Sequence, residues 1–98
     1  MNIYEIPCLG KEKKLEQIDG EYVGKFRRYI FVGKVEGLYE LNGKKFLKVD
    51  GYTVGNNQFG TDRVKRLWLK DDENIYIGER VIVVKRGDEV VVELKRRR

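Results

Sequence analysis

The pair Asn42-Gly43 is the feature that most constrains how this chain can fold. Asn-Gly is the preferred pair for a two-residue type I′ turn, because both turn positions need positive φ. Such a turn fixes the register of the strands on either side, and the residues it brings face to face form compatible cross-strand pairs. The sequence therefore predicts a hairpin with Leu41 opposite Lys44, Glu40 opposite Lys45, Tyr39 opposite Phe46 and Leu38 opposite Leu47.

A second hairpin is predicted near the end of the chain. Gly87-Asp88 is typical of a type II′ turn, which has glycine in its first position. Apolar residues at consecutive positions place valines on both faces of the flanking strands, as in the interior of a barrel or sandwich. The expected strands are 80–86 and 89–95, with Arg86 opposite Glu89, Val84 opposite Val91 and Val83 opposite Val92.

The rest of the chain is also typical of strands. Residues that favour pleated sheets make up about a third of it, and alanine, the best helix former, is absent. Residues 1–24 predict one or two short strands, and 26–35 predicts one long strand with a bulge or bend at Gly33.

Only the segment 61–70 is ambiguous. Thr61 or Asp62 could cap a short helix, because Val64, Leu67 and Trp68 follow at helical spacing. The low helix propensity of valine and tryptophan favours a strand. We therefore expect an all-β fold, a small OB-like or SH3-like barrel with at most one short helix near 61–70.

Length and charge indicate one domain, 1–98, because a chain of 98 residues cannot build two hydrophobic cores. Its net charge of +5 is concentrated at residues 95–98, a predicted basic C-terminal tail, which leaves 17 basic and 16 acidic residues in 1–94. Charged residues make up 38% of the chain, a proportion that resembles thermophile proteins.

Several function classes are excluded or disfavoured by composition. Without histidine or serine, the chain cannot form a Ser-His-Asp or Cys-His catalytic site. One cysteine, Cys8, excludes an internal disulfide and ordinary zinc sites, and its thiol is expected to be inert. No phosphate-binding loop or dinucleotide motif is present. We therefore expect no enzyme activity, no cofactor and no metal.

Three polar features are most simply interpreted as turns or loops. The acidic run 71–73 is expected to be a solvated turn rather than a cation site, and Asp50-Gly51 a turn or bulge. The segment 56–58, Asn-Asn-Gln, is a loop that either connects strands or contacts a ligand. No membrane-spanning or targeting segment is recognisable, which predicts a cytoplasmic protein with no membrane partner.

Basic and aromatic residues interleave in three segments, and this is the feature that most suggests a function. Proteins that bind single-stranded nucleic acid combine a positive groove with aromatic platforms for base stacking. The alternative is that Tyr39, Leu41 and Phe46 form the core face, with Lys44 and Lys48 at its rim reaching water. The candidate residues are Arg27, Arg28, Tyr29, Tyr39, Lys44, Phe46, Lys48, Tyr52, Arg63, Lys65, Arg66 and Trp68, together with Lys95, Arg96, Arg97 and Arg98 of the tail.

The sequence therefore favours a non-enzymatic β-barrel module that binds single-stranded nucleic acid or RNA. Lys and Arg would contact phosphates, and exposed aromatic rings would stack on bases. The alternative is a protein-interaction or structural assembly module, such as a component of a virion or another complex, with the basic tail on an acidic protein partner. The two hypotheses differ in whether the aromatic residues are exposed together beside lysines.

Overall fold

The computed structural model describes residues 10–55 and 61–97, which form a single antiparallel sheet of seven strands and contain no helix. The prediction of an all-β fold is confirmed. The strands lie in the order β4-β3-β2-β1-β7-β6-β5 across the sheet. They are β1 (Lys13–Phe26), β2 (Tyr29–Leu41), β3 (Lys44–Gly55), β4 (Asp62–Trp68), β5 (Asn74–Ile77), β6 (Val81–Arg86) and β7 (Glu89–Arg96).

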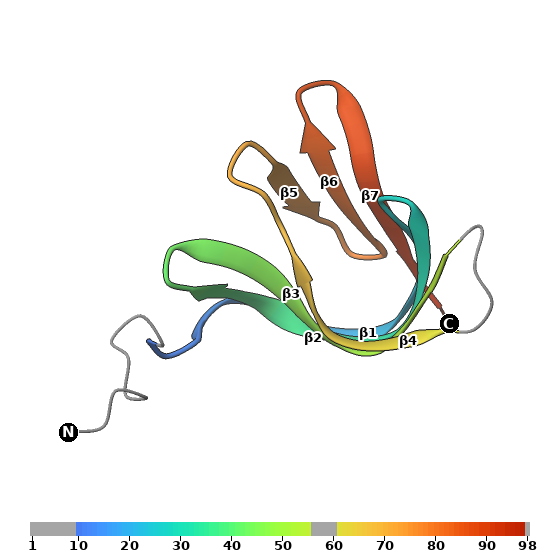
Figure 1. Cartoon of the computed structure of the whole chain (residues 1–98), viewed down its shortest axis with the longest axis horizontal. Coiled ribbons are helices and arrows are strands. Elements are labelled where there is room, and N and C mark those ends of the chain that lie inside the picture. The colour runs from blue at the N-terminus through green and yellow to red at the C-terminus, as the bar shows by residue number, and fades with distance from the viewer. Residues whose placement is uncertain (1–9, 56–60, 98) are drawn as a thin grey trace.

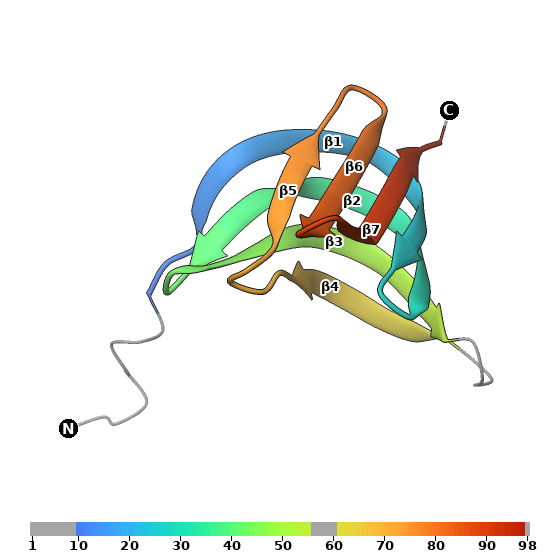
Figure 2. The same ribbon diagram turned by 90° about the horizontal axis from the view of Figure 1, so that it is seen from above.

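The sheet curls on itself but does not close, so the predicted barrel is wrong. Figure 1 shows β1–β4 as a curved layer, with β5–β7 on its concave side, and Figure 2 shows the two layers face to face. The two layers are joined where the end of β1, Tyr22–Phe26, pairs with β7. The edge strands β4 and β5 do not pair, although only residues 69–73 separate them in the chain.

The hairpin at Asn42-Gly43 has the predicted geometry. Asn42 has φ 55° and Gly43 has φ 83°, as a type I′ turn requires. All four predicted pairs, from Leu41 opposite Lys44 to Leu38 opposite Leu47, are present. The rings of Tyr39 and Phe46 lie 5.9 Å apart.

The second hairpin has the predicted turn, but its valines are paired one residue away from the expected positions. Gly87 has φ 61°, and Arg86 lies opposite Glu89. Val84 lies opposite Val92 rather than Val91, and Val83 lies opposite Glu93. The cause is a bulge: the register shifts by one residue between Val84 and Lys85, which the sequence did not indicate.

Two of the uncertain segments are now defined. Residues 62–68 form strand β4, as their propensities favoured, and not a helix. Asp50-Gly51 lies at a register shift between β3 and β4, which confirms the bulge. Gly33 lies opposite Gly51, and a Cβ on Gly33 would be 2.5 Å from the Gly51 Cα, so these glycines allow close approach where the layer bends.

The first part of the chain differs more from expectation. Strand β1 is a single strand of 14 residues, and the segment 26–35 is not continuous, because a turn at Arg27-Arg28 separates β1 from β2. Arg27 has φ 57°, a conformation that is uncommon for residues other than glycine, so nothing in the local sequence indicates this turn.

The expected basic tail is part of the sheet over most of its length. Lys95 and Arg96 are the last residues of β7, opposite Val23 and Tyr22 of β1. The backbone amide of Arg97 donates a hydrogen bond to the carbonyl of Glu21, 2.7 Å away. The remaining member, Arg98, lies outside the described residues.

The core lies between the two layers. Leu47 and Val49 of β3 are fully buried on the concave side, and Val84 and Val92 of the second layer are fully buried in the same cluster. Phe46, which alternates with Leu47 along β3, is also 0% exposed but is not part of this cluster. The main core therefore lies on the face of β3 opposite Phe46, and not on the face of Tyr39 and Phe46 as the alternative interpretation proposed.

Candidate nucleic-acid interface

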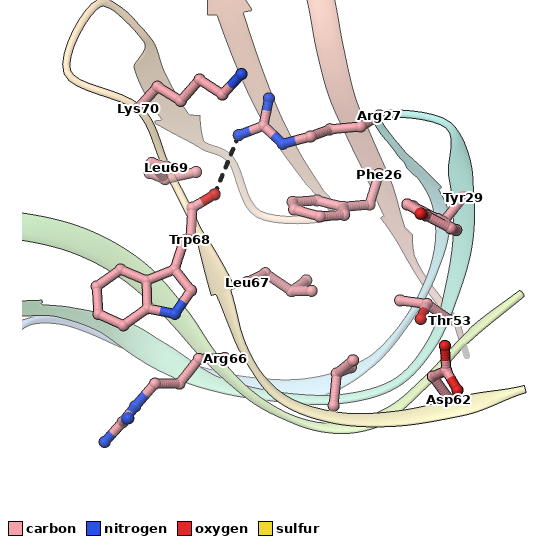
Figure 3. Close-up of a pocket in the computed structure, with 11 residues that line it drawn as sticks. Phe26, Arg27, Tyr29, Thr53, Asp62, Arg66, Leu67, Trp68, Leu69 and Lys70 are labelled. Atoms are coloured by element: carbon pink, nitrogen blue, oxygen red, sulfur yellow. Dashed lines mark hydrogen bonds between the residues drawn. The ribbon is translucent and has the colours of Figure 1, made fainter. Parts of the chain in front are cut away.

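A cleft of about 440 Å³ opens beside β4, where the sheet fails to close. Figure 3 shows its two walls: the end of the β1–β2 hairpin, with Phe26 and Tyr29, faces strand β4, with Leu67. Phe26 packs against the core and is half-buried, and Tyr29 is 43% exposed. The cleft is therefore mainly apolar, with two aromatic side chains that face its interior.

Trp68 and Arg66 border the cleft mainly through their backbone. In Figure 3 the indole ring and the guanidinium group both point away from the interior. Both residues pair with residues of β3 whose side chains lie on the outer face, Phe46 and Lys48. These two candidates therefore belong to the outer face of the sheet rather than to the cleft.

A second, basic pocket of about 240 Å³ adjoins the cleft. It shares Arg27 and Lys70 with the cleft, so the two cavities meet at these side chains. Its lining residues come from the β1–β2 turn, the β4–β5 link and the β6–β7 hairpin: Lys25, Arg27, Arg28, Lys70, Arg86, Glu89 and Val91. Five cations and a single carboxylate thus line one cavity of a protein whose charges are otherwise nearly balanced.

Glu73 lies behind this pocket, and its side chain is completely buried. Its carboxylate accepts two hydrogen bonds from Arg27, at 2.7 and 2.8 Å, one from Arg86 at 3.3 Å and one from the backbone amide of Lys70 at 2.8 Å. These bonds, from Arg27 above all, lower the pKa of Glu73 from 4.5 to about 2. The run 71–73 does make a turn, but its third residue is not solvated, which corrects that expectation.

Arg27 connects both sides of the opening in the sheet. Its guanidinium group is bound to Glu73, and it also donates a hydrogen bond of 3.0 Å to the carbonyl of Trp68 on the free edge of β4. Its charge lies 5.0 Å from the centre of the Phe26 ring. Since an unpaired carbonyl at a sheet edge is open to other strands, this bond also protects part of the β4 edge.

The outer face of β2–β4 collects most of the remaining candidates. Tyr39, Phe46 and Trp68 stack in a row, with ring centres 5.9 and 4.8 Å apart. Phe46 is in the middle and fully buried, so it is not available for stacking on a base. Trp68 is 41% exposed, whereas Tyr39 is half-buried.

The cations beside these rings are already paired with acids. Glu12 accepts hydrogen bonds from Arg66 and, at 3.2 Å, from Lys48, and these bonds hold its pKa below the usual value. Arg66 and Lys48 in turn lie over aromatic rings, with Lys48 5.0 Å from the centre of Tyr39. Both cations of this cluster are therefore already engaged by a carboxylate.

The same holds at both ends of the outer face. Asp50 lies 3.1 Å from Arg63 and 3.7 Å from Lys65, and their proximity lowers its pKa. Lys44 lies 3.9 Å from Asp71. Tyr52, 46% exposed, is on this face, next to Arg63 in the neighbouring strand.

The candidates at the end of β7 form a third group. Lys95 and Arg97 are exposed. Arg96 is half-buried, because its guanidinium group lies 5.3 Å from the centre of the Tyr22 ring and donates a hydrogen bond of 3.0 Å to the carbonyl of Asp19. The three groups of candidates are therefore not one surface. Arg27, Arg28 and Tyr29 lie at the cleft and the basic pocket, whereas Arg66 and Trp68 border the cleft but direct their side chains to the outer face.

Five residues of this site were not among the candidates from the sequence: Lys25, Phe26, Lys70, Glu73 and Arg86. Lys70 and Arg86 lie outside the three segments in which basic and aromatic residues interleave, and only the approach of three connections in the folded chain brings them together. Glu73 lay in an acidic run that is typical of exposed turns. Phe26 directly precedes Arg27, so it could have been included with that basic and aromatic segment.

Other site types find no support in the described part of the chain. It contains no group of three His, Cys, Asp or Glu side chains that could hold a metal ion. In the same residues, no helix has the length and apolar character needed to cross a membrane. Cys8 and the segment 56–58 lie outside the described residues.

Neither the family models, the curated proteins nor the solved structures contain a match to this chain. The geometry and charge of the cleft and the basic pocket are therefore the features that bear on function.

Proposed function

We propose that this protein is a non-enzymatic module that binds single-stranded nucleic acid in the cleft beside β4. The observation that carries the proposal is that an apolar cleft with two aromatic side chains meets a pocket lined by five cations, at Arg27 and Lys70. Bases would lie against Phe26 and Tyr29, and the adjoining phosphates would contact the basic pocket. Both contacts are tolerant of sequence, so the expected binding has little base preference.

The cleft is favoured over the outer face because the cations at the two surfaces differ in whether a carboxylate already binds them. Lys48, Arg63 and Arg66 on the outer face have carboxylate partners at hydrogen-bond distance. A phosphate would have to displace those partners, which reduces the gain in free energy. At the basic pocket, Lys25 and Arg28 have no ion pair among the described residues, so they can contact a phosphate directly.

Two tyrosines provide a matched test of this location. Tyr29 lines the cleft and is 43% exposed, whereas Tyr52 lies on the outer face and is 46% exposed. Binding of a labelled oligonucleotide is measured by fluorescence anisotropy at low salt for the wild type, Tyr29→Ala and Tyr52→Ala. Loss of a stacked base costs about 1–3 kcal/mol, so Tyr29→Ala should weaken binding about tenfold. Tyr52→Ala should change it by less than about twofold.

The reverse pattern, with Tyr52→Ala weakening binding and Tyr29→Ala leaving it unchanged, would place the interface on the outer face. Absence of binding by the wild-type protein at low salt would reject the nucleic-acid function altogether. Thermal unfolding of both variants is measured alongside, so that a change in affinity is not confused with a loss of the fold.

A second candidate function is protein interaction, and a different surface favours it. Val23, Ile30 and Tyr52 are 37%, 45% and 46% exposed, and they lie on the outer face of three consecutive strands. Val32 is paired with both Val23 and Tyr52 and connects them. An exposed apolar surface of this kind suits a protein partner. Protein interaction becomes the better-supported function if the oligonucleotide titration shows no binding.

A further inference from the structure

The basic pocket has a charge distribution that needs an explanation. Lys25 and Arg28 line it from the β1–β2 hairpin and Lys70 lines it from the β4–β5 link, while Arg27 and Arg86 are bound to Glu73. Cations brought together in one cavity repel one another, and an isolated fold gains nothing from that repulsion. A bound anion would convert it into a favourable interaction.

Glu89 is the one carboxylate in the lining of the pocket, and Glu73 accounts for only a further part of the positive charge. Glu73 takes both terminal nitrogens of Arg27 and one of Arg86, and Arg86 also lies 3.6 Å from Asp72. The carboxylate therefore holds the two arginines in place from behind. No ion pair occupies Lys25, Arg28 or Lys70 among the described residues, and these three lining residues are exposed.

We propose that this pocket is a binding site for a single phosphate group. Arg28 and Lys70 would donate to its oxygens, while Glu73 positions Arg27 and Arg86 and is not itself a ligand. This assignment of the ligand rests on the proposed function. The phosphate in the pocket is then the one next to the nucleotide base that lies in the cleft. The smaller volume of the pocket, about 240 Å³ against about 440 Å³ for the cleft, agrees with a phosphate in one and a base in the other.

The test uses phosphate alone as well as nucleotides. Thermal unfolding of the full chain is followed in sodium phosphate and in sodium pyrophosphate, each against sodium chloride at the same ionic strength and pH. Binding of a nucleoside 5′-monophosphate and of a short oligonucleotide is measured by calorimetry. The variant is Arg28→Ala with Lys70→Ala, two exposed side chains.

A matched control removes the same charge elsewhere. Lys34 and Arg80 are also exposed and lie outside the basic pocket, so Lys34→Ala with Arg80→Ala has the same net charge as the pocket variant. Pyrophosphate should raise the Tm of the wild type and the control by at least about 2 °C, and that of the pocket variant by much less. The pocket variant should bind the monophosphate at least about tenfold more weakly, since contacts to a charged group are lost.

The outcomes separate this proposal from the proposed function. If phosphate and pyrophosphate act as expected but an oligonucleotide binds no better than phosphate, the pocket is a site for free phosphate compounds and the nucleic-acid function fails. If the oligonucleotide binds but the pocket variant behaves like the control, the phosphate site is wrong and the cleft alone carries binding. Equal Tm values in chloride and pyrophosphate would also reject the phosphate site.

Discussion

The buried carboxylate of Glu73 should make the fold sensitive to acid within a defined range of pH. Its pKa is about 2 in the folded chain, against an ordinary value of 4.5. Because the folded value is the lower one, the unfolded chain takes up the proton first. The stabilisation is therefore complete above about pH 4.5 and is lost as the pH falls towards 2. The difference between the folded and unfolded pKa values predicts that the free energy of unfolding falls by about 2 kcal/mol between pH 7 and pH 3.

Replacing Glu73 by glutamine should remove this dependence. Glu73→Gln keeps the shape of the side chain but leaves Arg27 and Arg86 without their buried partner. Breaking a buried ion pair lowers the free energy of unfolding by about 3–5 kcal/mol. Arg27 retains 20% exposure and its hydrogen bond to the Trp68 carbonyl, so the expected loss at pH 7 is only about 2 kcal/mol. Between pH 7 and pH 3 the variant should lose about 2 kcal/mol less than the wild type.

The assay is urea unfolding at pH 7, 5, 4 and 3, followed by the fluorescence of the single tryptophan. Asp71→Asn is the control, because this carboxylate is two residues away and its side chain is 83% exposed. It should differ from the wild type by less than about 0.5 kcal/mol at any pH. If the free energies of unfolding of the wild type and Glu73→Gln fall in parallel with pH, Glu73 is not the ionised partner of Arg27, and the reasoning is refuted.

Three further changes test the fold and the distribution of charge. Gly43→Val should destabilise the protein by at least about 1 kcal/mol, since valine is strained at φ 83° and no neighbour within 4 Å compensates; an unchanged urea midpoint would contradict the type I′ turn. Gly24→Ala should cost more than about 2 kcal/mol, because its Cβ would overlap the backbone of β7, and a stable variant would exclude the β1–β7 pairing. The logarithm of the oligonucleotide binding constant falls linearly with the logarithm of the salt concentration, and each phosphate contact contributes about 0.7 to the slope. Lys95→Gln with Arg97→Gln should leave this slope within about 0.7 of the wild-type value, whereas Arg28→Ala with Lys70→Ala should lower it by about 1.4. Equal slopes for the two variants, measured by anisotropy from low to moderate salt, would show that binding follows net charge and not the pocket.

The parts of the fold that follow from local chemistry could be predicted. Asn42-Gly43 and Gly87-Asp88 set their turns because glycine is the residue that adopts positive φ without strain. The register beyond the first turn followed directly. The turn at Arg27-Arg28 could not be found in this way, because Arg27 adopts φ 57° without being glycine, and its guanidinium group is held by Glu73, 46 residues later in the chain.

The candidate site was less predictable, because it also depends on contacts between residues that are far apart in the sequence. Runs of basic and aromatic residues were visible, but the sequence does not show which cations are balanced by distant acids. Glu12 accepts hydrogen bonds from Arg66, 54 residues away, and from Lys48, so one carboxylate engages two cations of the outer face. Lys70 and Arg86 join the pocket only because two connections meet there in the folded chain. Burial of Phe46 likewise depends on Tyr39 and Trp68, which come from the two neighbouring strands and pack on either side of it.

The central claim, that single-stranded nucleic acid binds in the cleft beside β4, is tested most directly by mapping the contact surface. Amide chemical shifts of the labelled protein are followed while a short oligonucleotide is added at low salt. The account predicts that the largest changes occur at residues 25–29, 62–70 and 86–89, which surround the cleft and the basic pocket. Changes confined to the outer face around Tyr39 and Tyr52, or no changes at all, would contradict it.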